Sequence, residues 1–251
     1  MAKYQIALNA DMGESFGNYK VGNDELLMQY VSTVNLACGF HAGDPVVMRN
    51  SVGYAKEHGV SVGAHPGFHD MQGFGRRMMN ITTDELYTDM LYQMGALDAF
   101  LRVAGMEMTH VSPHGELDPL VSNNEEYARA FLRSIRDYKA DMKIIAEDKC
   151  ILTKMAEADG FSVKRVGFPD LTYDAQGNYI VDRTKKAMDP ETIAAQSVRM
   201  VKEGRAKSVD GSFFPVRVDV LCYHSDVPNA AEIMQAVHKA FDAESIEIIG
   251  F

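Results

Sequence analysis

Residues 33–65, TVNLACGFHAGDPVVMRNSVGYAKEHGVSVGAH, contain the clearest fold signal in the chain. Two short β-rich runs, Thr33–Ala37 and Val60–Gly63, enclose a longer helical pattern. Asp44 is the predicted N-cap of this helix, Pro45–His58, and Pro45 fits the first helical position because it needs no backbone N–H donor there. A strand, a helix and a second strand in this order are typical of parallel strands covered by helices.

The same alternation continues along the whole chain of 251 residues. Strands are predicted at Tyr4–Leu8, Thr33–Ala37, Val60–Gly63, Met108–Val111, Lys143–Ala146, Ser162–Val166 and Arg217–Cys222. Helices are predicted at Asp24–Tyr30, Pro45–His58, Asp84–Ala104, Glu125–Tyr138, Lys149–Ala158, Pro190–Glu203 with Asp189 as N-cap, and Asn229–Phe241. Seven such units favour one α/β domain over residues 1–251, a TIM-like (β/α) barrel of about seven parallel strands rather than an open doubly wound sheet. The irregular stretch Leu171–Met188, with its basic run Arg183-Thr184-Lys185-Lys186, predicts a hairpin or flap.

The composition excludes several classes of protein. Lys and Arg number 25 against 35 Asp and Glu, so the formal charge of −10 gives nucleic-acid binding no electrostatic support. Cys38, Cys150 and Cys222 lie far apart without a CxxC spacing, which indicates neither a disulfide framework nor a cysteine zinc site. No apolar run approaches the roughly 20 residues of a membrane helix, and no hydrophobic signal core follows the first residue. We therefore expect a soluble, cytoplasmic protein whose partners are small molecules or other proteins.

Polar residues able to do chemistry follow five of the seven predicted strands. These segments are residues 9–14 (NADMGE), 38–44 (CGFHAGD), 64–67 (AHPG), 112–116 (SPHGE) and 223–226 (YHSD). The carboxyl ends of parallel strands meet at one end of a barrel, and the active sites of such barrels lie at that end. We therefore expect Asp11, His41, His65, His114 and His224 to share one cavity.

A carboxylate and several histidines that converge can hold a divalent metal ion or act as a general acid and base. The first candidates for metal ligands are Asp11, His41 and His65. No local spacing such as HExxH supports a metal, and each histidine has the alternative role of a hydrogen-bond partner for loop backbone, so both interpretations stay open. Histidines expected to be structural or solvated are His58, His69, His110 and His238.

Two glycine-flanked motifs compete for a functional role. Residues 13–17, GESFG, match the nucleophile-elbow pattern, but a loop follows Ser15 where that motif requires a helix, so a nucleophilic serine is the minor alternative. Residues 73–77, GFGRR, place Arg76 and Arg77 on a flexible loop that is able to bind a carboxylate or phosphate. The sequence has no phosphate-loop or dinucleotide-binding fingerprint, so it shows no nucleotide site of its own.

Five sequence blocks resemble the LamB/YcsF family: residues 8–24 (LNADMGESFGNYKVGND), 35–45 (NLACGFHAGDP), 62–77 (VGAHPGFHDMQGFGRR), 92–100 (YQMGALDAF) and 112–116 (SPHGE). The similarity continues more weakly through residues 168–170, 210–211 and 221–226. The resemblance implies a distorted barrel of the glycoside hydrolase/deacetylase type and an ATP-dependent opening of the lactam 5-oxo-L-proline to L-glutamate. It also implies partner subunits of the oxoprolinase B and C type, on which ATP would be used.

The chain departs from the family pattern at positions next to the expected site. Ser112 stands where the family has lysine, Leu171 stands where it has arginine, and residues 116–119 (ELDP) replace a typical ALYN. Ser225 replaces the glycine that follows the last histidine of the pattern. Lysine and arginine would neutralise a substrate carboxylate or a developing oxyanion, so their loss leaves the exact substrate open.

The mechanism predicted from these residues is hydrolysis of a cyclic amide. Asp11 and His114, together with Glu14, are the predicted catalytic groups. The predicted substrate-binding residues are His41, His65, Arg76, Arg77, His224 and Asp226. A divalent metal ion is an open alternative, and so is a homo-oligomeric state.

Two other functions stay open at this point. One is a metal-dependent deacetylase of an N-acetylated sugar or related amide, which the implied fold and the set of Asp11, His41 and His65 suggest. The other is a non-catalytic or altered-substrate member of the family, which Ser112 and Leu171 suggest.

Overall fold

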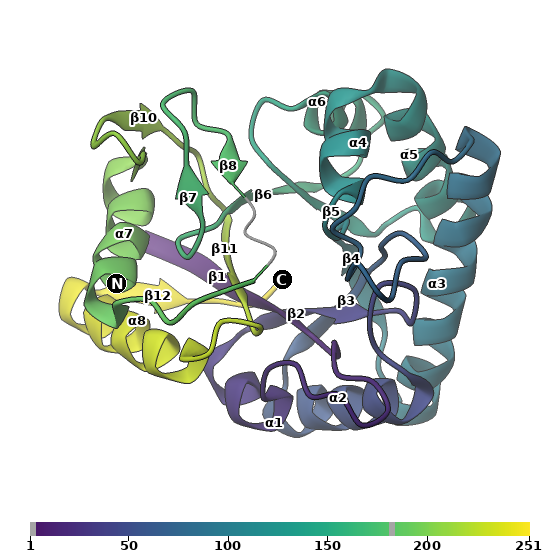
Figure 1. Cartoon of the computed structure of the whole chain (residues 1–251), viewed down its shortest axis with the longest axis horizontal. Helices are drawn as coiled ribbons and strands as arrows, with labels where there is room; N and C mark the ends of the chain where they lie inside the picture. Colours follow the sequence, from purple (N-terminus) through teal and green to yellow (C-terminus); the bar gives the residue numbers. More distant parts are fainter. Residues whose placement is uncertain (1–3, 181–183) are drawn as a thin grey trace.

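The computed structural model describes residues 4–180 and 184–251, and a closed barrel of parallel strands forms its centre (Figure 1). The seven barrel strands are β1 (Tyr4–Met12), β2 (Thr33–Ala37), β3 (Ser61–His65), β4 (Met108–Val111), β5 (Lys143–Ala146), β6 (Val163–Gly167) and β11 (Val220–His224). Each pairs with the next in this order, and β11 closes the ring by pairing with β1, where Asp11 lies opposite His224. The predicted TIM-like α/β barrel is therefore confirmed.

Helices cover the outside of the barrel (Figure 1). They are α1 (Asp24–Leu27) with its 3-10 continuation η1 (Met28–Tyr30), α2 (Pro45–His58), α3 (Thr83–Ala104), α4 (Leu117–Asn123), α5 (Glu125–Lys139), α6 (Ile151–Ala158), α7 (Pro190–Glu203) and α8 (Ala230–Glu244). The predicted N-caps are confirmed, since the side chains of Asp44 and Asp189 accept hydrogen bonds from backbone amides of the first turns of α2 and α7. In the described part of the chain, no helix combines the length and the apolar character needed to cross a membrane.

Alternation along β1 separates two environments. Ile6 and Leu8 point outward into the main core between strands and helices. Ala7 points into the barrel, where it belongs to a small apolar cluster with residues of β5, β6 and β11. Asn9 and Asp11 follow Ala7 at the same period, so the interior becomes polar toward the carboxyl ends of the strands. The polar half of the barrel interior is the place where a site is built.

Some strands extend further than the sequence predicts. β1 ends at Met12 instead of Leu8, and β11 ends at His224 instead of Cys222. The added residues include Asp11, which is buried inside the barrel and hydrogen-bonded there. Because the hydrophobic pattern stops where the interior becomes polar, that pattern alone does not reveal these strand ends.

Several short elements lie outside the seven predicted units. The predicted hairpin or flap is present as β7 (Thr172–Tyr173) paired with β8 (Tyr179–Ile180), and Arg183 of the predicted basic run lies outside the described residues. Elements that the sequence did not predict are α4, the hairpin of β9 (Arg205–Lys207) with β10 (Phe213–Pro215), and β12 (Ile246–Ile248), which pairs with the start of β1. Such short elements are missed because a few residues do not show a period.

Candidate active site

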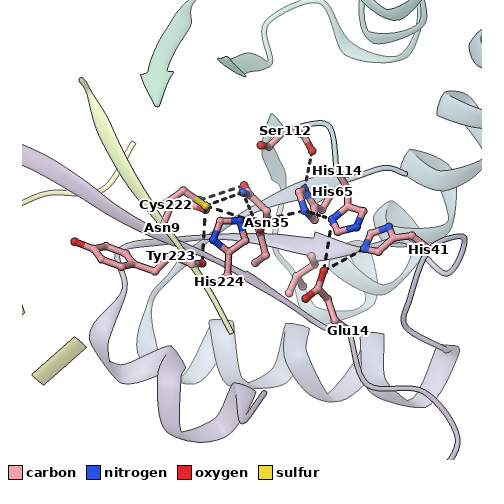
Figure 2. Close-up of polar contacts among 12 residues, drawn as sticks. Asn9, Glu14, Asn35, His41, His65, Ser112, His114, Cys222, Tyr223 and His224 are labelled. Carbon is pink, nitrogen blue, oxygen red and sulfur yellow. Dashed lines mark hydrogen bonds and ion pairs between the residues drawn. The ribbon is translucent and has the colours of Figure 1, made fainter. Parts of the chain in front are cut away.

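A cavity lies at the carboxyl ends of the barrel strands and is lined by residues from distant parts of the sequence. Figure 2 shows the polar contacts among His65, His114 and His224 and their neighbours. Asp11 comes from β1, His65 ends β3, His114 follows β4, and His224 ends β11. Four of the five residues expected to share a cavity therefore do line one, and His41 lies directly behind His114. The remaining polar lining consists of Arg76, Ser112, Asp118, Tyr179 and Cys222.

Asp11 is a buried carboxylate surrounded by groups that favour its charged form. Its Oδ1 accepts a 2.8 Å hydrogen bond from Nδ2 of Asn35 and lies 3.4 Å from Nε2 of His65. Its Oδ2 lies 3.7 Å from Nε2 of His224. Burial alone would raise the pKa of Asp11, but the His65 and His224 charges and the hydrogen bonds from His65 and Asn35 outweigh it and hold this pKa far below its usual value. Asp11 is therefore ionised at neutral pH.

His65 and His114 form a close pair whose outer nitrogens are fixed by the backbone. Nδ1 of His65 lies 2.8 Å from the carbonyl oxygen of Ser112, and Nε2 of His114 lies 2.7 Å from that of Phe74. The two remaining nitrogens, Nε2 of His65 and Nδ1 of His114, lie 2.9 Å apart. Burial, followed by the charges of His41 and His65, lowers the pKa of His114 well below its usual value.

Glu14 and His41 complete a buried cluster around this pair (Figure 2). Oε1 of Glu14 lies 3.3 Å from Nε2 of His41 and 3.6 Å from Nδ1 of His114. The rings of His41 and His114 stack with centroids 3.6 Å apart. Burial, followed by the nearby carboxylate charge of Asp11, raises the pKa of Glu14 well above its usual value. The cluster gathers four donor atoms of Glu14, His41, His65 and His114 within 4.8 Å of one another, which is a set that a metal ion could use.

On the opposite side of Asp11, His224 is held by Asp170. Nδ1 of His224 lies 3.1 Å from Oδ1 of Asp170, and the backbone N–H of His224 donates to Oδ2 at 2.8 Å. Burial would raise the pKa of Asp170, but the charge and hydrogen bonds of His224 lower it overall. Sequence reasoning missed Asp170 as a site residue, and the available signal was its position shortly after the predicted strand Ser162–Val166.

The side chains of the adjacent Arg76 and Arg77 lie in different environments. Arg76 lines the cavity, and its Nη1 donates to Oδ2 of Asp226 at 2.8 Å. Arg77 lies outside the cavity with a half-exposed side chain, and its Nε donates to Oδ2 of Asp70 at 2.9 Å. Asp226, predicted to bind substrate, is the ion-pair partner of Arg76 and does not itself line the cavity.

Buried amides and a histidine form the floor beneath Asp11. Nε2 of His110 lies 2.9 Å from Oδ1 of Asn35, and Asn9 donates from Nδ2 to the same oxygen at 3.1 Å. Burial, followed by the charge of Lys143, lowers the pKa of His110 to about 3, so the ring is neutral and its Nε2–H donates to Asn35. These contacts fix the orientation of the Asn35 amide so that its nitrogen faces Asp11. His110 is structural, as expected from the sequence.

A hairpin residue reaches the cavity from the side. Tyr179 of β8 donates from its hydroxyl to Oδ2 of Asp118 at 2.7 Å, and Ser122 donates to Oδ1 at 2.9 Å. Burial raises the pKa of Asp118 above its usual value, although these two hydrogen bonds partly offset the effect. The hairpin β7–β8 therefore forms one wall of the cavity.

Ser15 does not lie in this cavity. Its hydroxyl bonds to the backbone of Val21, and Phe16 and Tyr19 form an isolated bridge in place of a helix. This geometry agrees with the sequence, in which the nucleophile elbow is the minor alternative.

Comparisons with known proteins find one family and relatives that match nearly the whole chain. A model of the LamB/YcsF family matches residues 6–251. A protein of Pyrococcus abyssi, named as the A subunit of 5-oxoprolinase, is 41% identical over 248 residues, which cover 98% of this chain and 97% of that protein. The crystal structure of a lactam utilization protein from Thermus thermophilus aligns with a TM-score of 0.89 at 38% identity, covering 98% of this chain and all of that one. A family 4 carbohydrate esterase from Streptomyces lividans, at 10% identity, 99% and 93% coverage and a TM-score of 0.51, shares the fold alone.

Proposed function

Because this chain belongs to the LamB/YcsF family, we propose that it hydrolyses a cyclic amide and opens 5-oxo-L-proline to L-glutamate. We further propose that the reaction depends on ATP and on partner subunits of the oxoprolinase B and C type. The names of the relatives, the A subunit of 5-oxoprolinase and a lactam utilization protein, support this proposal. The observation that carries it is the cavity in which an ionised Asp11 lies 3.7 Å from Nε2 of His224.

Hydrolysis of a lactam requires a proton to be taken from water and a proton to be given to nitrogen. The water oxygen bonds to the carbonyl carbon, the C–N bond breaks, and the ring nitrogen receives a proton to become the amine. His224 is placed for both transfers because Asp170 holds its Nδ1 and leaves Nε2 facing the cavity. Asp11, ionised beside it, stabilises the imidazolium that forms after the first transfer.

This assignment changes one role predicted from the sequence. His114 is the acid–base partner of Asp11 in that prediction, but both its nitrogens are engaged, one by the carbonyl of Phe74 and one by His65. A proton carrier needs a nitrogen that can reach the substrate, and His224 has one. We therefore assign the acid–base role to Asp11 and His224.

The carboxylate of the substrate needs a cation. Among the described residues that line the cavity, Arg76 provides the one guanidinium, and its Nη1 already donates to the carboxylate of Asp226 at 2.8 Å. We assign Arg76 to substrate binding. The activation by ATP is assigned to the partner subunits because this sequence has no phosphate loop.

The test is to incubate the chain with 5-oxo-L-proline, ATP and candidate partner subunits and to measure glutamate. The A subunit of 5-oxoprolinase from Pyrococcus abyssi with its own partners serves as the positive control. Glutamate formed only when the chain, its partners and ATP are all present is the expected result. Absence of glutamate in mixtures where the control is active would refute the proposal. Acetate released from an N-acetylated sugar by the chain alone would instead identify a deacetylase.

A further inference from the structure

The contacts of His65 and His114 at the base of the cavity cannot all be satisfied if both rings are neutral. A carbonyl oxygen only accepts hydrogen bonds, so Nδ1 of His65, 2.8 Å from the Ser112 oxygen, carries a hydrogen. Nε2 of His114, 2.7 Å from the Phe74 oxygen, carries one for the same reason. In neutral rings the other two nitrogens then both present lone pairs, yet they face each other at 2.9 Å. A positive species is needed between them.

A proton on Nε2 of His65 would face Nδ1 of His114 and, at 3.4 Å, Oδ1 of Asp11, but it would leave the nearby ligand atoms of Glu14 and His41 without a cation. Oε1 of Glu14 lies 3.6 Å from Nδ1 of His114, and Nε2 of His41 lies 3.3 Å from the same oxygen. All four donor atoms lie within 4.8 Å of one another and all four residues are buried. Four buried donor atoms this close together fit a metal cation with several ligands better than a proton shared by two nitrogen atoms.

We propose that Glu14, His41, His65 and His114 bind one divalent transition-metal ion of the zinc type. Imidazole nitrogen and carboxylate oxygen are ligands that zinc prefers, at bond lengths of about 2.0–2.2 Å, which places tetrahedral ligand atoms roughly 3.3 Å apart. The separations of 2.9, 3.3 and 3.6 Å found here lie on either side of that value. Small side-chain shifts bring the four atoms to a common centre.

Backbone carbonyls and two glycines around the cluster fix the positions of the histidine rings. The carbonyls of Ser112 and Phe74 fix the two rings from behind, which is the usual support for a histidine ligand. A Cβ atom at Gly67 would lie 2.6 Å from Nδ1 of His41, and one at Gly75 would lie 2.8 Å from Cδ2 of His114. Glycine at both positions leaves the space in which His41 and His114 stack.

This ligand set differs from the one predicted from the sequence. Glu14 and His114 join His41 and His65, while Asp11 falls outside the four-donor group and remains available for the acid–base role. His65 and His114 also line the cavity, so an ion bound here is reached from the substrate side. The ion would belong to the proposed active site. Its binding can be tested separately from the reaction, because metal binding is measured without substrate.

The test is a titration of the chelator-treated full chain with Zn²⁺, followed by calorimetry and by elemental analysis of the washed protein. We expect one ion per chain and a loss of affinity of about 100-fold or more in Glu14→Gln and in His114→Gln. The matched control is His238→Gln on α8, where Nε2 of His238 bonds to the Tyr30 carbonyl oxygen far from the cluster, and its affinity should equal wild type. Circular dichroism shows whether each variant is folded.

Two results would overturn the metal site: no zinc bound by the folded wild-type chain, or zinc affinity unchanged in both cluster variants. A second measurement on the wild type alone uses Co²⁺, whose visible absorption is intense in a tetrahedral site. Intense bands that Zn²⁺ displaces are expected, and a weak octahedral spectrum contradicts the proposed ligand geometry. Zinc binding without glutamate formation would refute the proposed lactam hydrolysis and support the metal site. Glutamate formation by protein that binds no zinc would support the hydrolysis and refute the metal site.

Discussion

Replacing Asp11 with asparagine removes the charge of the carboxylate and keeps nearly the same side-chain shape. The asparagine Oδ1 can still accept from Nδ2 of Asn35, a bond of 2.8 Å in the wild type, so the floor of the site is retained. Losing the charge removes hydrogen bonds that contribute about 1.5–3 kcal/mol each, and it also removes the cost of several kcal/mol for burying a carboxylate. Because the lowered pKa of Asp11 means that these attractions outweigh the burial cost, we expect the variant to remain folded but to lose about 1–3 kcal/mol of unfolding free energy, with Tm lower by roughly 2–12 °C.

The effect on turnover is much larger. In the proposed mechanism Asp11, 3.7 Å from Nε2 of His224, stabilises the imidazolium of that histidine. We expect the loss of such an acid–base partner to lower kcat by about 10²–10⁴-fold, or roughly 3–5 kcal/mol of activation free energy. Glutamate release with saturating 5-oxo-L-proline, ATP and partner subunits measures kcat, and calorimetry measures Tm. The matched control is Asp210→Asn, which changes a carboxylate bonded to Ser208 and Ser212 in the loop between β9 and β10 and should leave kcat unchanged. If Asp11→Asn keeps more than about a tenth of wild-type kcat, Asp11 is not a catalytic group.

Three further predictions concern Asp170 and Arg76 of the site and the carboxyl group of Glu147. Asp170→Asn should lower kcat by about 100-fold and leave KM nearly unchanged, because asparagine no longer holds Nδ1 of His224 as a carboxylate does; a change confined to KM contradicts this role. Arg76→Ala should raise KM for 5-oxo-L-proline by roughly 30-fold, the equivalent of about 2 kcal/mol for a charged hydrogen bond, while Arg77→Ala outside the cavity leaves it unchanged. Equal effects of the two arginine variants would show that substrate does not bind at Arg76. Burial, followed by the charge of Asp118, raises the pKa of Glu147 from 4.5 to about 8, so the folded chain keeps a proton that the unfolded chain releases and its stability falls as pH rises between these values. Melting curves should therefore show that Glu147→Gln raises Tm at pH 8 and has little effect at pH 4.5, and the same Tm change at both pH values would refute the shift.

The barrel could be predicted from the sequence because its signals are local. Caps such as Asp44 and Asp189, with proline directly after each, mark where helices begin, and apolar runs mark the strands. The end of the barrel that holds the site also followed from order alone, since the carboxyl ends of parallel strands lie together. Placing Asp11 and His65 in one cavity therefore required only the strand order.

The contacts within the site could not be predicted, because they depend on how the strands are staggered and on loops that cross the barrel mouth. Arg76 and Arg77 are adjacent in sequence, yet only Arg76 turns into the cavity, and no local pattern distinguishes them. Asp170 binds His224 across 54 residues, a separation that leaves no periodic signal. That Glu14 rather than Asp11 lies among the donor atoms of His41, His65 and His114 depends likewise on side-chain directions that spacing does not encode.

A crystal structure of this chain with 5-oxo-L-proline bound would show directly whether the lactam occupies the cavity. We predict the lactam in the cavity, with its amide about 2.6–3.2 Å from Nε2 of His224 or from Asp11 and its carboxylate on Arg76. Ordered 5-oxo-L-proline elsewhere on the molecule, with the cavity holding only water, would show that the proposed substrate does not bind at this site.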